Sequence, residues 1–218
     1  VYTKLYPLKM TSFIKEACVE SLDEALKAEE QGADRIELCA DLSQDGITPE
    51  RDVIRKAKEQ LRIPIRVMIR PRGGDFVYTA SEVNQMMQDI KFCKVIGVEG
   101  VVFGILKDNN TLDLGKIAAL AAHSSPLKIV IHKAIDETPD ILKATEGLTH
   151  INGISTILSS GGKATAKEGI SILKKMIVVA GNKLEIMPAG RITIGNLDEI
   201  HKSIGACAYH GRQIVGEN

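Results

Sequence analysis

The fold of this chain is decided around the stretch Ile69-Arg70-Pro71-Arg72-Gly73-Gly74-Asp75-Phe76. An apolar run over residues 65–69 leads into this stretch and is typical of a short buried strand. Two arginines, a proline and two glycines follow, and the glycines allow the backbone to turn sharply. The stretch therefore predicts a buried strand that ends in a polar loop.

The same order, a short apolar run and then a longer amphipathic segment, recurs along the chain. Helix starts are marked by N-cap residues, such as Ser21 with Glu24 at the capping-box position and Thr48 with Pro49 at the first helical position. Strands are predicted over residues 13–19, 35–39, 65–69, 100–106, 128–132, 154–158, 184–187 and 206–210. Helices are predicted over about 21–32, from 48 onward, from 79 or 81 to 97, and over about 112–122, 139–147, 165–180 and 194–204.

Eight strands that alternate strictly with helices favour an α/β fold of the (β/α)8 TIM-barrel type. Strand–helix–strand units impose parallel pairing with right-handed crossovers, and eight of them suit a closed barrel. A doubly wound open sheet is the alternative, but the first turn, Glu20-Ser21-Leu22, lacks its glycine fingerprint. The final helix is missing or reduced. We expect a second copy of the chain to cover that side, which predicts a homodimer.

Composition limits the classes of function. The chain has 218 residues, of which 44% are hydrophobic, and this predicts one domain over residues 12–218 after an N-terminal leader or tag-like segment, 1–11. Lysine plus arginine balances aspartate plus glutamate at 28 each, and aromatic residues make up only 4%, so nucleic acid is not an expected partner. No apolar run is long enough to span a membrane. Four widely spaced cysteines without a CxxC motif indicate reduced thiols in the cytoplasm.

In a barrel of this type the functional residues lie at the carboxyl ends of the strands. Arg70 and Arg72 are two residues apart at such an end, so both are expected to point to the same side and to form a fork for a carboxylate or phosphate. The alternative is a loop in which Arg72 makes a surface salt bridge with Asp75.

Strands one and two end in the same pattern, Glu16-Ala17-Cys18 and Glu37-Leu38-Cys39. A spacing of two residues places each glutamate on the same face as its cysteine. Cys18 and Cys39 are thus expected to approach each other, with both glutamates one layer below. Two facing thiols suit a soft monovalent ion such as Cu(I). The alternative is that both are small buried hydrophobic residues.

Other strand ends supply groups for catalysis or for anion binding. His132, or Glu37, is a candidate general acid or base, and Asp136 is expected to orient His132 or Lys133. The candidate catalytic residues are Glu16, Glu37, Arg70, His132 and Asp136, and the candidate anion-binding residues are Arg70, Arg72, Ser160, Gly161, Gly162, Gly190 and His210. These residues support an alternative function, an enzyme that acts on a small phosphorylated or carboxylated metabolite. Whether the chain is an enzyme stays open.

Several motifs together resemble the CutC family, which is named for copper homeostasis. They are Gly32-Ala33-Asp34-Arg35-Ile36-Glu37-Leu38-Cys39, Ile69-Arg70-Pro71-Arg72-Gly73-Gly74-Asp75-Phe76, His132-Lys133-Ala134-Ile135-Asp136, Leu158-Ser159-Ser160-Gly161-Gly162 and His210-Gly211. The resemblance implies a TIM-type barrel and a cytosolic protein of copper handling, with Cys18 and Cys39 at the positions of a Cu(I) site. The chain departs from the family pattern at Arg191, where most members have glycine.

Overall fold

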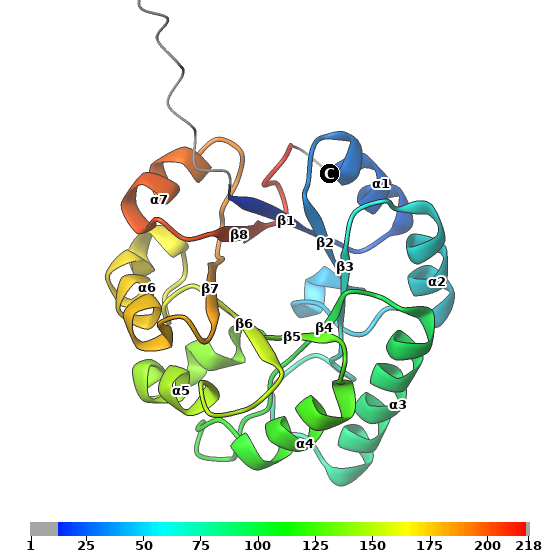
Figure 1. Cartoon of the computed structure of the whole chain (residues 1–218), viewed down its shortest axis with the longest axis horizontal. Helices are drawn as coiled ribbons and strands as arrows, with labels where there is room; N and C mark the ends of the chain where they lie inside the picture. The colour runs from blue at the N-terminus through cyan, green and yellow to red at the C-terminus, as the bar shows by residue number, and fades with distance from the viewer. Residues whose placement is uncertain (1–12, 217–218) are drawn as a thin grey trace, which may run out of the picture.

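Eight parallel strands form a nearly closed barrel, and the helices surround it on the outside (Figure 1). The computed structural model describes residues 13–216. The leader predicted for residues 1–11 lies outside the described residues. The strands are β1 (Ile14–Val19), β2 (Arg35–Leu38), β3 (Ile65–Met68), β4 (Gly100–Phe103), β5 (Lys128–Ile131), β6 (Ile154–Ser159), β7 (Glu185–Pro188) and β8 (Ala208–Gly211).

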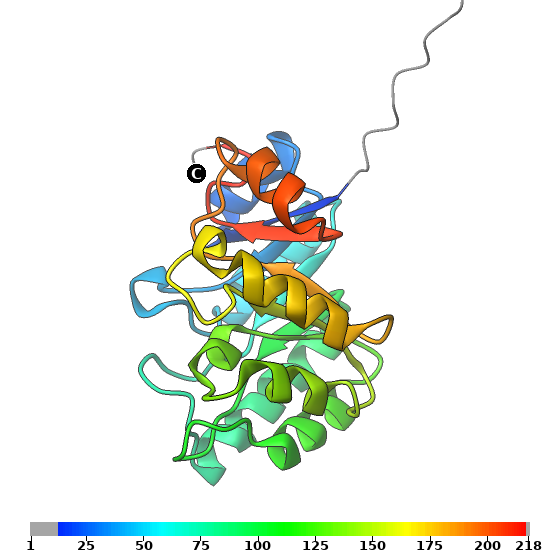
Figure 2. The same cartoon turned by 90° about the vertical axis from the view of Figure 1, so that its left-hand side faces the viewer.

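Each strand except β8 is followed, within the described residues, by an α-helix that packs on the outside of the barrel. The helices are α1 (Leu22–Glu30), α2 (Arg51–Gln60), α3 (Ala80–Ile96), α4 (Leu114–Ser124), α5 (Ile141–Leu148), α6 (Ala166–Ala180) and α7 (Leu197–Ile204). Two short 3-10 helices, η1 (Leu42–Gln44) and η2 (Lys133–Glu137), follow β2 and β5. The side view shows the helices slanting in parallel across the strands (Figure 2). The predicted TIM-type barrel is confirmed.

The strands pair in chain order from β1 to β7, and β8 pairs with the other side of β1, so the ring is open between β7 and β8. Between β7 and β8, the described residues form only a single bridge, from Thr193 to Gln213, just beyond the strand ends. The junction between β7 and β8 is therefore the least hydrogen-bonded part of the barrel. No helix follows β8 in residues 212–216, and the homodimer inferred for this side stays a prediction.

Strand alternation divides the core into two parts. Side chains that point outward pack against the helices and form the larger cluster. Side chains that point inward fill the barrel. Among them, Cys18, Cys39 and Met68 belong to one buried cluster at the carboxyl ends of the strands. None of the described helices is long and apolar enough to cross a bilayer.

Local helix signals were confirmed where no tertiary contact competes with them. Thr79 caps α3 in a complete capping box with Glu82. The predicted start of α2 was wrong, because α2 begins at Arg51. Thr48 instead bonds to the end of β3: its Oγ1 accepts from the Arg70 amide at 2.8 Å, and its own amide donates to the Arg70 carbonyl at 2.9 Å. Thr48, which was predicted to cap a helix, therefore instead joins the loop after β2 to the end of β3.

Candidate functional site

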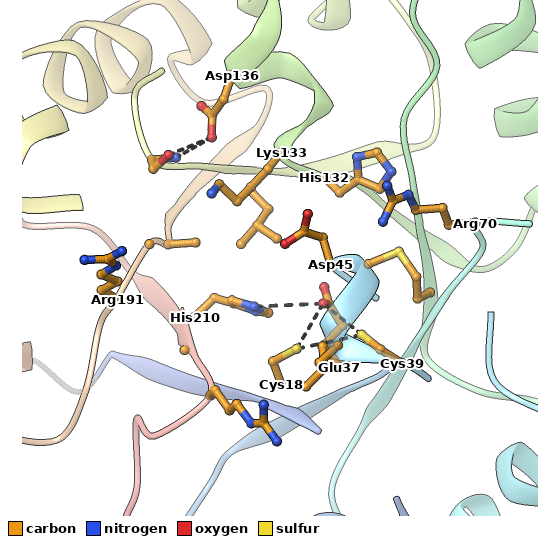
Figure 3. A pocket seen from close by; sticks show the side chains of 18 of the residues that line it. Cys18, Glu37, Cys39, Asp45, Arg70, His132, Lys133, Asp136, Arg191 and His210 are labelled. Atoms are coloured by element: carbon orange, nitrogen blue, oxygen red, sulfur yellow. Dashed lines mark hydrogen bonds and ion pairs between the residues drawn. The ribbon is translucent and has the colours of Figure 1, made fainter. Parts of the chain in front are cut away.

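A cavity of about 550 Å³ opens at the carboxyl ends of the strands (Figure 3). That volume is enough for a small molecule. The cavity is lined by ten of the predicted site residues, namely Cys18, Glu37, Cys39, Arg70, His132, Asp136, Ser160, Gly162, Gly190 and His210. Glu16, Arg72 and Gly161 are not among its lining residues.

The two cysteines meet at the floor of this cavity. Their sulfur atoms are 3.7 Å apart, and Cys18 and Cys39 are only 8% and 1% exposed. Glu37 Oε1 lies 3.7 Å from the Cys18 sulfur and 3.5 Å from the Cys39 sulfur. The strand register pairs Cys18 with Glu37, so Glu37 is level with Cys18 and not one layer below it. Glu16 does lie one layer below, opposite Arg35.

These three residues could hold a metal ion, because their donor atoms all lie within 4.8 Å of one another. With metal–sulfur bonds of about 2.3 Å, a sulfur separation of 3.7 Å corresponds to an angle of about 107° at the ion. A linear two-coordinate ion would need the sulfurs about 4.6 Å apart. The geometry therefore suits a bent arrangement with room for a third ligand.

Glu16 anchors a buried ion network below the thiols. Its Oε1 accepts from His210 Nδ1 at 3.0 Å, while Oε2 pairs with Arg35 and, at 3.4 Å, with Arg66. Burial raises the pKa of Glu16, but the hydrogen bond from His210 and the two arginines outweigh it and hold that pKa at about 2. Burial lowers the pKa of His210, yet Glu37, Cys18 and Glu16 together raise it well above its ordinary value. His210 is therefore an imidazolium that faces the site.

The thiols and Glu37 have unequal proton affinities. A hydrogen bond from Cys39 lowers the pKa of Cys18 to about 5, against the opposing effect of burial and with help from His210. The same hydrogen bond, followed by burial, raises the pKa of Cys39. Burial raises the pKa of Glu37 to about 8. Cys18 is therefore the group of this site that ionises first, while Cys39 and Glu37 keep their protons to higher pH.

The two arginines of the β3 loop do not form a fork. Arg70 is buried, and its guanidinium donates to the backbone carbonyls of Gln44, Gly46 and Gly74 at 2.6, 3.1 and 2.8 Å. It thereby fixes the loop after β2, which lies beside Cys39.

Arg72 points to other partners. It pairs with Glu82 at 2.5 Å and with Asp75 at 2.9 Å. The pair with Asp75 is the salt bridge that was the alternative to an anion fork. Arg70 stacks over Phe76 and Arg72 over Tyr78, at 4.8 and 5.3 Å from the ring centres.

His132 is buried on the opposite wall of the cavity from the thiols (Figure 3). Its Nδ1 accepts from the Ala134 amide at 3.1 Å, which places the ring proton on Nε2. Burial, followed by the charge of Arg70, lowers the pKa of His132 to about 3. Nε2 has no hydrogen-bond partner in residues 13–216. The ring is thus a neutral donor at physiological pH.

Asp136 does not orient His132, because its carboxylate faces the glycine loop after β6. It accepts from Ser159 Oγ at 2.5 Å and from the amides of Ser160 and Gly162 at 2.9 Å each. The amides that were predicted to bind an external anion therefore already hold a carboxylate of the chain.

Gly190 and Arg191 form the β7 side of the cavity. Gly190 has φ +101°, and a Cβ there would lie 3.0 Å from that of Ser160, so the close approach requires glycine. Arg191 has φ +55°, a conformation that glycine adopts at far lower cost than arginine. Among the described residues, its guanidinium forms no ion pair.

Two residues of the ion network were not predicted. Arg35 and Arg66 reach Glu16 from the inner faces of β2 and β3. The spacing Arg35-x-Glu37-x-Cys39 places all three on the same face of a strand, and this was the available signal.

Comparisons with known proteins agree with this architecture. The model of the CutC family matches residues 13–215. The human copper homeostasis protein cutC homolog is 40% identical over 198 residues, which cover 91% of this chain and 72% of the human protein. A CutC family protein of Mesorhizobium japonicum is 37% identical and covers 89% of this chain and 75% of its own length. A crystal structure of a CutC protein from Streptococcus agalactiae superposes with a TM-score of 0.88 at 33% identity, over 93% of this chain and all of the other.

Proposed function

The chain belongs to the CutC family, and we propose that it is a copper homeostasis protein that binds Cu(I) in the cytoplasm through Cys18 and Cys39. The observation that carries this proposal is the pair of buried sulfurs 3.7 Å apart at the floor of an open cavity. Thiolates are soft ligands that favour Cu(I) over harder ions.

The charges around the sulfurs support a monovalent ion. Two thiolates and the His210 imidazolium carry a net charge of −1, which Cu(I) neutralises, whereas a divalent ion would reach the same balance only by also displacing the proton of Glu37. Buried charge that is not balanced is costly. Cys18 is already a thiolate at neutral pH, so copper needs to displace only the proton of Cys39.

The depth of the site bears on the role in copper handling. Because both sulfurs are nearly inaccessible from outside, a partner protein has little access to the bound ion. Direct hand-over to another protein usually requires an exposed site. We therefore favour storage or sensing of copper over delivery.

The test is an anaerobic titration with Cu(I) against a competing chelator. We expect tight one-to-one binding by the wild type and loss of that binding in Cys18→Ser/Cys39→Ser. Cys207→Ser removes an exposed thiol and serves as the control that should bind normally. Circular dichroism checks the fold of each variant. Equal binding by the double variant would overturn the proposal.

The enzyme alternative has less support from the geometry. Its main anion donors are engaged within the chain, since Arg70 binds backbone carbonyls, Arg72 pairs with acidic residues, and the glycine-loop amides hold Asp136. The feature that favours it is the cavity, which is larger than an ion requires. Titration calorimetry with small phosphorylated and carboxylated molecules in the absence of copper tests this alternative.

A further inference from the structure

The sulfur separation leaves the copper site short of one ligand. At 3.7 Å the two sulfurs suit a bent ion, and a bent two-coordinate ion has an open side. Glu37 Oε1 lies 3.7 and 3.5 Å from the two sulfurs, but a carboxyl oxygen is a hard donor. The His210 ring is directed at carboxyl groups on both sides, with Nδ1 bonded to Glu16 Oε1 at 3.0 Å and Nε2 3.9 Å from Glu37 Oε1. A soft neutral donor is what the site lacks.

Met68 is in the right place to supply it. The register of β2 and β3 pairs Leu38 with Val67, and its continuation by one residue places Cys39 opposite Met68. Side chains directly opposite on neighbouring strands lie about 5 Å apart. Met68 is 5% exposed, belongs to the same buried cluster as both cysteines and lines the same cavity. Three consecutive strands thus direct a sulfur side chain into the barrel at one end.

Met187 shows that this placement is particular to Met68. Its side chain also belongs to the inner cluster, but its sulfur accepts from Arg35 Nη2 at 3.3 Å and it does not line the cavity. Among residues 13–216, none donates a hydrogen bond to the Met68 sulfur. A methionine side chain has three rotatable bonds, so its thioether can turn toward an ion between Cys18 and Cys39.

We propose that Met68 is the third copper ligand, so that Cu(I) is held by the sulfur atoms of Cys18, Cys39 and Met68. This inference rests on the proposed function, because it assumes that the two cysteines bind copper. A thioether carries no proton and no charge, so its ligation leaves the charge balance of the site unchanged. It also adds a third soft donor, which increases the preference for Cu(I) over Zn²⁺.

The matched pair Met68→Leu and Met187→Leu tests this ligand. Leucine nearly conserves the volume of methionine and removes only the sulfur, so both variants should fold. We expect Met68→Leu to weaken Cu(I) binding by about 10- to 100-fold, the range that loss of supporting groups of a metal site commonly costs. Met187→Leu should bind as the wild type does. X-ray absorption should count three sulfurs around copper in the wild type and two in Met68→Leu.

The pH dependence separates ligation from an indirect effect on the thiols. Because the thioether does not titrate, its loss should weaken binding by the same factor at pH 6 and pH 8. A factor that changes with pH, or a sulfur count of two in the wild type, would overturn the proposal. If Met68→Leu binds normally while Cys18→Ser/Cys39→Ser does not, the third ligand is wrong and the thiol site stands. If the double cysteine variant still binds, the thiol site itself is wrong.

Discussion

Glu16 and His210 are direct partners across the β1–β8 pairing, and a hydrogen bond of 3.0 Å joins Glu16 Oε1 to His210 Nδ1. The bond fixes the imidazolium so that its other side faces Glu37, whose Oε1 lies 3.9 Å from Nε2. The charge of this ring also helps to keep Cys18 ionised. This pair of strands therefore connects the buried ion network to the metal site.

Replacement of His210 should raise the pKa of Cys18. In His210→Gln the neighbouring positive charge is lost, so we expect the pH at which Cys18 ionises to rise from its wild-type value of about 5. The measurement is thiolate absorbance or alkylation rate against pH in a Cys93→Ser/Cys207→Ser background. His150→Gln, at an exposed position, is the control. An unchanged profile in His210→Gln would contradict the coupling.

His132 should make the protein less stable in acid. Its pKa falls from 6.5 in the unfolded chain to about 3 in the fold, so the unfolded chain binds the extra proton first. This contribution to stability is complete above pH 6.5 and is lost as the pH falls toward 3. His132→Asn keeps an acceptor for the Ala134 amide but cannot titrate. Its melting temperature should fall less than that of the wild type between pH 6.5 and 4, and parallel curves would refute the assignment.

Arg70 should matter for stability far more than Arg72. Arg70→Lys keeps the charge but cannot bind the carbonyls of Gln44, Gly46 and Gly74 together, so we expect a loss of about 3 kcal/mol in the free energy of unfolding. Arg72→Lys, at a partly exposed ion pair, should cost less than about 1 kcal/mol. Urea unfolding measures both. Hydrogen exchange over residues 41–46 should quicken only in Arg70→Lys.

Because the backbone at Arg191 has a positive φ, glycine at this position should give a more stable protein than alanine. At φ +55° an alanine keeps the steric cost of a Cβ, whereas glycine removes it. Arg191→Gly should therefore be about 1 kcal/mol more stable than Arg191→Ala, although glycine increases the freedom of the unfolded chain. Since both variants lack the guanidinium, the comparison isolates the backbone. Equal stability would show that the conformation carries no strain.

The barrel was predictable because its signals are local and repeated. Each strand is a short apolar run, each helix has a periodic face, and parallel pairing follows from their alternation. The approach of Cys18 to Cys39 was predictable for the same reason, since strand period and adjacency determine it. The position of Glu37 at the same height as Cys18 was not predictable, because the offset between neighbouring strands depends on how the whole ring closes.

Contacts between distant loops limited the prediction of the site. Asp136 was assigned to His132 or Lys133, which are near it in sequence, but the end of β6 and the glycine loop after it offer two amides and two hydroxyls. Arg70 was assigned to an external anion, but the carbonyls of two loops reach it first. In both cases the partner is a backbone group whose position the sequence pattern does not specify.

The offset between β1 and β2 also affects how the site withstands oxidation. Because Cys18 is paired with Glu37, Cys39 is its diagonal neighbour, and diagonal neighbours have Cα atoms about 7–8 Å apart. A disulfide needs Cα atoms within about 7 Å, so the two cysteines can share an ion but cannot join to each other unless the strands move. An oxidant that would join a directly paired couple of cysteines should therefore not form a disulfide between these two. The same barrel that brings the sulfurs together thus disfavours the disulfide between them that would prevent copper uptake.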